Sequence, residues 1–402
     1  MDYIKRPDYL SMLRKWKDHH IIKVLTGVRR AGKSTLLSLF RSELLKDGVD
    51  EKQIVAVNFE DADFGRIQTS DDLWEYMRPR LAEGRTTYVF LDEIQRVKDF
   101  EKAVDGLFVK PDVDIYVTGS NAFLLSGEIA TYLSGRYVTV PVYPLSFREY
   151  CEGLGLCDSP ERAWMNYLRF GSFPQVVSLG NDPELVSSFN EGIYHTILQK
   201  DVLSRCRTDA TSMFERIVAF MFDNIGNVSS VRSIAGTLAA DGMKIAPNTI
   251  DEYLNRLCEA YLLHKVKAID VQGREHLKTG CKYYVADIGI RNYLLGSRQF
   301  DRGHVLENVV YLELLRRHGE VFIGRNGTKE IDFIARDAGD VTYYQVAETL
   351  AGDEVREREF NALRTVRDHH PKMILTLDPV PPSNDGGIRT VNALDFLLGK
   401  CD

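Results

Sequence analysis

One eight-residue segment near the N-terminus restricts the fold of this 402-residue chain more than any other feature. Residues 27–34, GVRRAGKS, fit the pattern G-x4-G-K-[ST] at every required position. The apolar run Ile21–Thr26 precedes them, and a helical pattern over Ser34–Leu45 follows. A glycine-rich turn between a buried strand and a helix points backbone N–H groups and the positive end of the helix dipole at an anion. The segment therefore predicts a phosphate-binding loop in a parallel α/β sheet.

The residue types of this loop indicate a nucleoside triphosphate and a magnesium ion. Gly27 and Gly32 let the backbone curl around phosphate oxygens. The ammonium of Lys33 contacts the β- and γ-phosphates in such loops, and the hydroxyl of Ser34 is a ligand of Mg²⁺. The predicted nucleotide-binding residues are Gly27, Arg29, Arg30, Ala31, Gly32, Lys33, Ser34 and Thr35. Nothing in these residues selects adenine over guanine.

A phosphate loop of this kind needs a carboxylate at the end of a neighbouring strand, where it holds the water shell of the metal. Asp92 and Glu93 directly follow the apolar run Tyr88–Leu91. This is the end of a parallel strand at which ligands bind. We assign Asp92 to the Mg²⁺ and Glu93 to polarising the attacking water, because a glutamate after the aspartate indicates hydrolysis rather than kinase chemistry.

Two further candidates concern the γ-phosphate. The strand Ile115–Thr118 ends in small polar residues, and Ser120 or Asn121 is placed to contact the γ-phosphate or the attacking water; a plain turn is the alternative. Arg136 precedes the next strand, and a guanidinium suits the charge that develops on a transferring phosphoryl group. The alternative for Arg136 is a surface residue with a packing role. A catalytic Arg136 could act within its own chain or on a neighbouring subunit.

The rest of the chain suggests several modules. Strand patterns at 21–27, 53–60, 87–93, 114–120 and 136–145 predict a core over 1–150. Residues 151–211 are helical, and 212–296 carry helices followed by a hairpin. The last block, 297–402, begins with a long helix near 304–317 and continues as strand, strand, helix, strand.

Charge and composition restrict the partners and the compartment. The chain has 51 basic and 58 acidic residues, a net charge of −7, so its charge does not indicate DNA, although DNA stays open as a partner. No apolar run is long enough for a membrane helix, so no membrane is expected as a partner. The N-terminal residues lack a signal-peptide pattern, and the six Cys are scattered without a CxxC pair, so we expect a cytoplasmic protein.

A family resemblance extends these inferences. GVRRAGKST, YVFLDEIQ, YVTGSNAFLLS, LSGRY and PVYPLSFREY, in that order, resemble prokaryotic AAA-type ATPases whose C-terminal half is a domain of unknown function with a restriction-endonuclease-like core. The likeness continues through YLRFGSFPQVV, KYYVADIGIRN and EIDFIA. It implies a multidomain α/β chain: a P-loop core of the AAA/ASCE type (1–150), a helical lid (151–211), a winged-helix-like module (212–296) and a nuclease-like domain (297–402). In the AAA arrangement, the strand ending near Ser120 lies between those that carry Gly27 and Asp92.

The residues of 212–296 agree only partly with a DNA-binding winged helix. The second helix, opening at Asn248, carries Asp251, Glu252 and Glu259, which disfavour insertion into a groove. Basic residues of the hairpin are better placed to meet phosphates; they are Lys265, Lys267, Arg274, Lys278 and Lys282. A protein-binding or connecting module is the alternative.

The last block departs from the nuclease pattern that it resembles. A PD-(D/E)xK nuclease needs an acid on the helix, an aspartate on one strand and (D/E)-x-K on the next. Glu307 and Asp332 match, but Gln345 stands at the acid position and Ala347 at the lysine. Lys329 could substitute from the neighbouring strand. We therefore expect an inactive nuclease-like fold that serves a structural or partner-binding role.

Together these features predict a Mg²⁺-dependent ATP-binding protein that hydrolyses ATP to drive or gate the binding of an unidentified protein partner. One alternative is a nucleotide switch with negligible hydrolysis. Another is a DNA-processing protein that uses the winged helix and the nuclease-like domain. The oligomeric state is open.

Overall fold

The computed structural model describes residues 4–120, 133–202, 211–271, 276–296, 302–379 and 381–401. The chain forms two compact units, one of Met1–Pro144 with Glu259–Tyr261 and one of Leu145–Cys258 with Leu262–Asp402. Among the described residues, no helix combines the length and apolar character needed to cross a membrane.

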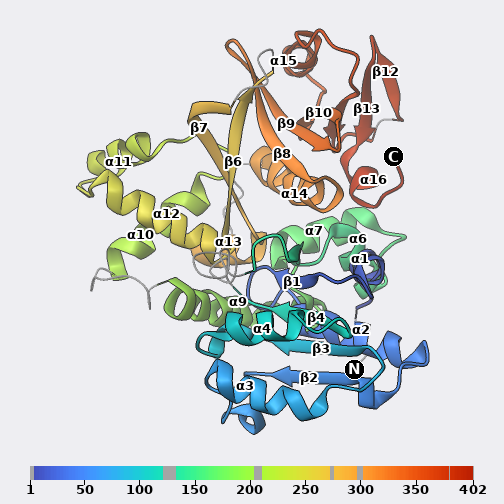
Figure 1. Cartoon of the computed structure of the whole chain (residues 1–402). Helices are drawn as coiled ribbons and strands as arrows, with labels where there is room; N and C mark the ends of the chain where they lie inside the picture. The colour runs from blue at the N-terminus through green and yellow to red at the C-terminus, as the bar shows by residue number, and fades with distance from the viewer. Residues whose placement is uncertain are drawn as a thin grey trace. The chain divides into compact units, whose positions relative to one another are not determined.

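The N-terminal unit is built on a parallel five-stranded sheet with the order β2-β3-β4-β1-β5 (Figure 1). Its strands are β1 (Ile22–Thr26), β2 (Ile54–Asn58), β3 (Thr87–Asp92), β4 (Val113–Thr118) and β5 (Tyr137–Pro141). Its helices are α1 (Pro7–Trp16), α2 (Lys33–Lys46), α3 (Ser70–Met77) and α4 (Phe100–Phe108). The five predicted strands are confirmed, and β4 lies between β1 and β3 as the resemblance implies.

Apolar side chains on both faces make this sheet a buried layer. On one face, Val89 and Val117 belong to a cluster that also includes Leu73 of α3 and Val104 of α4. On the other, Phe90 stacks on Tyr116 with ring centroids 4.9 Å apart, and Phe40 of α2 lies 5.3 Å from Tyr116. Helices therefore cover both faces, which is why the strands are continuous apolar runs.

The second unit begins with helices and continues into a mixed sheet. Its helices are α6 (Phe147–Leu154), α7 (Pro160–Phe170), α8 (Pro174–Ser178), α9 (Pro183–Ile197), α10 (Thr211–Asp223), α11 (Val231–Ala240), α12 (Pro247–Glu259), α13 (Ile288–Leu295), α14 (Arg302–Arg317), α15 (Asp353–Arg364) and α16 (Ala393–Leu397). Its strands are β6 (Leu263–Asp270), β7 (His276–Val285), β8 (Glu320–Asn326), β9 (Lys329–Asp337), β10 (Asp340–Ala347), β11 (Lys372–Thr376), β12 (Ser383–Asp385) and β13 (Ile388–Asn392).

These eight strands form one sheet with the order β12-β13-β11-β10-β9-β8-β6-β7. The predicted hairpin is present as β6 and β7. β6 pairs in parallel with β8, so one sheet contains strands from both sides of the predicted boundary at residue 296 (Figure 1). Three strands, β8, β9 and β10, precede α15, where the sequence pattern predicts two. The pattern misses β8 because its apolar core, Val321–Ile323, is short and is flanked by polar residues. The division of this unit at 211 and 296 stays a prediction.

Two of the family-like motifs meet inside this unit for a structural reason. The carboxylate of Asp287 accepts hydrogen bonds from the backbone N–H of Ser172, at 2.6 Å, and from its hydroxyl, at 2.8 Å. A Cβ on Gly171 would lie 2.4 Å from Oδ1 of Asp287, and one on Gly289 would lie 2.4 Å from the carbonyl oxygen of Phe170. The two glycines therefore permit a close approach of two chain segments, with the buried aspartate between them.

Candidate active site

The phosphate loop has the backbone shape that its sequence predicts. It connects β1 to α2, and Gly27 and Gly32 adopt φ of 137° and 98°. Arg30, between them, also has a positive φ of 68°. Gly32 precedes α2 directly, and its carbonyl accepts the first helical hydrogen bond from the N–H of Leu36 at 2.9 Å. The N-terminus of a 14-residue helix thus opens at the loop, with the partial positive charge that attracts phosphate.

Gly27 is required for space as well as for conformation. A Cβ at this position would lie 2.1 Å from the carbonyl oxygen of Val142. The N–H of Val142 in turn donates to the carbonyl of Thr26 at 2.7 Å, so the two segments are held against each other. A side chain here must displace backbone rather than a flexible neighbour.

We therefore expect Gly27→Ala to lower the free energy of unfolding by about 3 kcal/mol and to impair ATP binding. The matched control is Gly48→Ala. Gly48 also has a positive φ, of 89°, but no atom lies within 4 Å of its added Cβ. That control should cost about 1 kcal/mol and leave ATP binding intact. Chemical denaturation of both variants tests this, and equal losses would show that the contact with Val142 is unimportant.

Lys33 is buried within its own loop. Its Nζ donates to the carbonyl oxygens of Gly27, at 2.8 Å, and Val28, at 3.1 Å. Ser34 lies exposed in the first turn of α2, and Thr35 is half-buried. The ammonium and the hydroxyl are thus presented on the side of the loop where the helix begins, as a phosphate and its metal ion require.

Asp92 and Glu93 lie at the same edge of the sheet as the loop. The register aligns Leu25 of β1 with Thr118 of β4, and Leu91 of β3 with Val117. The hydroxyl of Thr118 donates to Oδ1 of Asp92 and accepts the N–H of Glu93 at 2.9 Å. Both carboxylates are buried. The hydrogen bond from Thr118 therefore fixes the direction of the Asp92 carboxylate. β3 lies two strands from β1, a distance of roughly 10 Å. This spacing suits a carboxylate that holds a metal ion through water.

Glu93 has a second contact that the sequence did not reveal. Its φ is 56°, and a short 3-10 turn, Ile94–Arg96, follows. This turn directs the side chain of Gln95 back, so that its Nε2 donates to Oε2 of Glu93 and lies 3.4 Å from the hydroxyl of Ser120. Gln95 thus connects the two predicted residues Glu93 and Ser120. Only the turn brings it there, and no pattern in the sequence signals that.

Arg6 is another residue that sequence reasoning missed. Its buried guanidinium donates to the carbonyl of Ala31 in the loop at 3.0 Å and to that of Tyr143 at 3.0 Å. It packs over the ring of Tyr9, 4.4 Å from the centroid. Arg6 therefore ties the loop to the chain after β5. No signal short of the tertiary structure relates residue 6 to residue 31.

The two arginines of the loop differ in their surroundings. Arg29 approaches Oε1 of Glu60 at 3.5 Å, and Arg96 contacts the same oxygen at 2.7 Å. The side chain of Arg30 is exposed. The backbone of both belongs to the loop, and a contact of either side chain with nucleotide stays a prediction. Asn121, the other candidate at the end of β4, lies outside the described residues.

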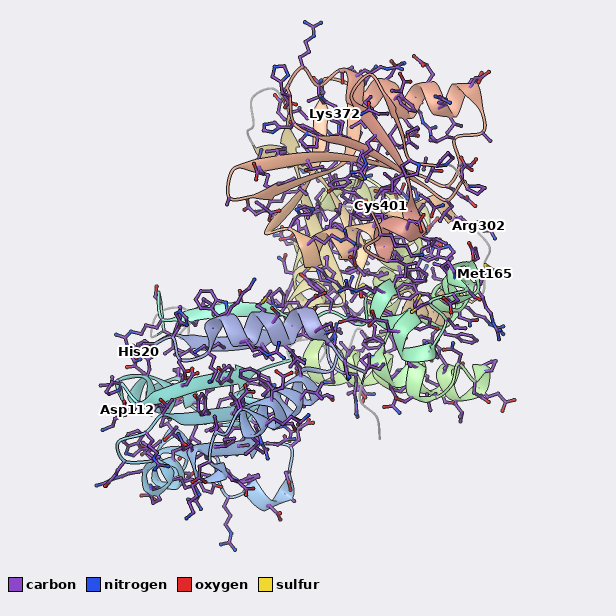
Figure 2. All side chains as sticks on the ribbon, turned by 90° about the vertical axis from the view of Figure 1, so that its right-hand side faces the viewer. His20, Asp112, Met165, Arg302, Lys372 and Cys401 are labelled. Carbon is purple, nitrogen blue, oxygen red and sulfur yellow. The ribbon has the colours of Figure 1, made fainter. Side chains whose placement is uncertain are left out.

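Arg136 lies away from this group. β5 runs parallel to β1 with Tyr137 opposite Ile22, so Arg136 is at the amino edge of the sheet. In Figure 2, His20 and Asp112, which precede β1 and β4, mark that side of the unit. The guanidinium is ion-paired with Asp105 of α4.

The length of β1 separates Arg136 from the phosphate loop of the same chain. β1 is five residues long, so roughly 15 Å of strand separates Arg136 from the loop. The structure therefore does not bring Arg136 to Lys33 of the same chain. Of the two alternatives, action on a nucleotide held by a second copy is the one that stays a prediction.

The basic residues of the predicted DNA-binding hairpin include one that is misassigned. Lys265 and Lys267 are exposed. Lys282 is instead buried, and its Nζ lies 2.8 Å from Oε1 of Glu307 and 2.7 Å from Oε1 of Glu330. It cannot meet a phosphate on the outer face of the hairpin. The prediction for Lys282 was wrong, because its side chain is directed at the acids of α14 and β9 and not at solvent.

Comparison with known proteins agrees with this geometry. Residues 19–151 match the model of an AAA domain, and residues 161–301 match a domain of unknown function. An uncharacterized protein of Haemophilus influenzae is 36% identical over 400 residues, which cover 98% of each chain. This chain belongs to the same family of AAA-domain proteins.

Two further proteins are also similar to this AAA-domain protein. An uncharacterized protein of Methanocaldococcus jannaschii is 29% identical over 337 residues, which cover 78% of this chain and 71% of that one. The solved Walker-type ATPase PABY2304 of Pyrococcus abyssi aligns with 73% of this chain and 96% of its own, with 16% identity and a TM-score of 0.50. That likeness shows the P-loop fold. Family and fold together support ATP binding at the loop of the AAA domain.

Proposed function

We propose that this AAA-domain protein binds Mg²⁺–ATP at residues 27–35 and hydrolyses it, and that the nucleotide state gates the binding of a protein partner. The observation that carries the proposal is the alignment of β1, β4 and β3. It gathers Lys33, Asp92 and Glu93 at one edge of the sheet.

The residues present fit such a ligand. The curled loop and the start of α2 supply N–H donors and a positive helix end, and the ammonium of Lys33 lies beside them. Ser34 and Asp92 are the residues that would hold the magnesium ion, Asp92 through water. When bound, that ion neutralises charge on the phosphates. The carboxylate of Glu93 then takes the proton from the attacking water, and Gln95 and Ser120 fix its orientation.

A nucleotide switch with negligible hydrolysis is the second candidate, and two observations favour it. The carboxylate of Glu93 already accepts a hydrogen bond from Gln95, which competes with a water molecule for that oxygen. Arg136 also lies at the far edge, so the described part of one chain does not place it near the phosphates. Turnover by an isolated chain should therefore be slow, and faster where a second copy supplies a guanidinium.

Phosphate release from ATP at increasing protein concentration tests these alternatives. We expect release that stops when Mg²⁺ is chelated, with a rate per chain that rises with concentration and falls in Arg136→Ala. Background release, combined with a higher melting temperature in ATP, would instead establish the switch. Absence of both effects would contradict nucleotide binding. Added DNA in parallel reactions tests whether nucleic acid stimulates turnover.

The three segments that follow the ATPase core would connect nucleotide binding to the partner. The helices of 151–211 serve as a lid, and α11, α12 and the β6–β7 hairpin as a winged-helix-like module for protein contact. The block 297–402 is the restriction-endonuclease-like domain. A cytoplasmic location fits the six cysteines, which are scattered without a CxxC pair.

A further inference from the structure

Arg6, which immediately precedes α1, bonds to two separate stretches of the N-terminal unit, and only 3% of it is exposed. Its Nη1 donates to the carbonyl oxygen of Ala31 in the phosphate loop at 3.0 Å. Its Nη2 donates to the carbonyl oxygen of Tyr143 at 3.0 Å and to that of Pro144 at 3.4 Å. Because a guanidinium is a rigid planar fork, the two stretches are held at a fixed separation by one buried side chain.

The carbonyl that Arg6 binds belongs to the peptide group between Ala31 and Gly32. A trans peptide group holds its C=O and its N–H on opposite sides, and no peptide bond in the described residues is cis. The hydrogen bond to Arg6 therefore directs the N–H of Gly32 away from the guanidinium. Backbone N–H groups are the donors with which loops of this kind surround phosphates. Arg6 thus sets the direction of one such donor from the opposite side of the peptide group.

Gly32 makes this peptide group easy to turn over. Its φ is 98°, and a glycine adopts positive and negative φ at about the same cost. A turned peptide group would place the oxygen of Ala31 where the N–H of Gly32 stands, and it would present a partial negative charge to the phosphates. The loop therefore needs a contact that selects one orientation. The charge-assisted hydrogen bond from Arg6 supplies it.

The other end of the same guanidinium holds the chain where it leaves the N-terminal unit. The N–H of Tyr143 donates to the hydroxyl of Tyr9 at 3.1 Å, and its carbonyl accepts the hydrogen bond from Arg6. Both backbone groups of Tyr143 are thus bound by residues at the start of the chain. Pro144, the next residue, is the last one before the chain passes to the second unit. The phosphate loop and this exit segment, residues 142–144, are therefore attached to one side chain.

We propose that Arg6 is a positioning residue of the nucleotide site and couples that site to the exit segment. It sets the peptide group between Ala31 and Gly32 for phosphate, and the same fork fixes the backbone of Tyr143. The inference rests on the proposed function, because it names the contact through which the nucleotide state reaches the end of the N-terminal unit. Coupling between two sites is reciprocal. A bound nucleotide therefore stabilises the exit segment, and an ordered exit segment strengthens nucleotide binding.

Binding of a non-hydrolysable ATP analogue with Mg²⁺ to the full chain tests the positioning role. Arg6→Met keeps an apolar stem but has no donor, and we expect it to weaken binding by roughly 10-fold or more, the effect of losing one charge-assisted hydrogen bond. Arg6→Lys should bind with intermediate affinity, because an ammonium lacks the fork that spans two carbonyls. Arg14→Met is the matched control. Arg14 lies exposed on α1 and pairs with Glu43 of α2, so its loss should leave the affinity unchanged.

Hydrogen exchange of the backbone at 142–144 tests the coupling, and it is a readout that a merely structural role would not change. In the unmodified chain and in Arg14→Met, the analogue should slow exchange of the Tyr143 amide. Arg6→Met is measured at an analogue concentration that saturates it. There we expect the protection of Tyr143 by the analogue to be largely lost, although the loop is occupied.

Four outcomes separate this inference from the proposed function. Equal affinity of Arg6→Met and the unmodified chain would overturn the positioning role and leave the proposed function intact. Equal protection of Tyr143 in the two saturated chains would overturn the coupling. If Arg6→Met does not fold, Arg6→Lys is used for the same two comparisons, and unmodified behaviour in both would contradict the inference. An unmodified chain that binds no analogue would overturn the proposed function as well.

Discussion

Lys33→Ala is expected to reduce the affinity for ATP by roughly 100-fold or more, the largest effect that a single substitution in the loop should have. The ammonium makes charge-assisted hydrogen bonds to two phosphates, and such bonds contribute roughly 1.5–3 kcal/mol each. In the structure it donates to the carbonyls of Gly27 and Val28. The variant should therefore also lose about 1 kcal/mol of stability without ATP. Calorimetric titration with a non-hydrolysable ATP analogue measures the first effect, and thermal unfolding the second.

The control for this substitution is Lys46→Ala. Lys46 belongs to the same helix, α2, but lies exposed at its other end. It should bind the analogue as tightly as the unmodified chain. If Lys33→Ala bound the analogue as tightly as the unmodified chain, the loop would not be the nucleotide site and the proposed function would be wrong.

Glu93→Gln is expected to preserve ATP binding and to lower turnover by roughly 10²–10⁴-fold, the usual contribution of a general base. Glutamine has the same size and can still accept the hydrogen bond from Gln95, so the 3-10 turn and the contact with Ser120 should persist. It cannot take a proton from water. Single-turnover hydrolysis and analogue binding, measured on the same preparation, separate the two effects.

Glu75→Gln serves as the matched control here, because Glu75 is exposed on α3. It should hydrolyse ATP at the unmodified rate. Unchanged turnover in Glu93→Gln would exclude Glu93 as the base. The water would then have to be activated by another group, and the hydrogen bond from Gln95 would be purely structural.

Local sequence patterns are sufficient to predict the loop and its sheet. The strand before Gly27, the helix after Gly32 and the acids after Leu91 each depend on residues that are adjacent in sequence. The parallel arrangement then brings the strand ends to one edge without further information. For this reason the sequence alone predicts one shared site for the loop residues and the acids that follow β3.

Residues that act across long separations in sequence could not be found in this way. Arg6 contacts the loop from 25 positions away, and Lys282 meets Glu307 across 25 positions and a different element. An isolated basic residue has no periodicity, and a lysine on a hairpin usually faces solvent. Only the ion pairs of Lys282 with Glu307 and Glu330 show that this lysine is directed into the protein, while Lys265 and Lys267 of the same hairpin are exposed.

The pairing of β6 with β8 has a practical consequence for dividing the protein into fragments. A fragment that ended at residue 296 would carry β6 with no neighbour on one side, and the complementary fragment would expose the backbone of β8. Unpaired N–H and C=O groups along such strands recruit other chains and lead to aggregation. A cut near residue 144, between the two compact units, leaves both sheets whole. The modular appearance of the sequence around 296 therefore does not mark a place where the polypeptide can be separated.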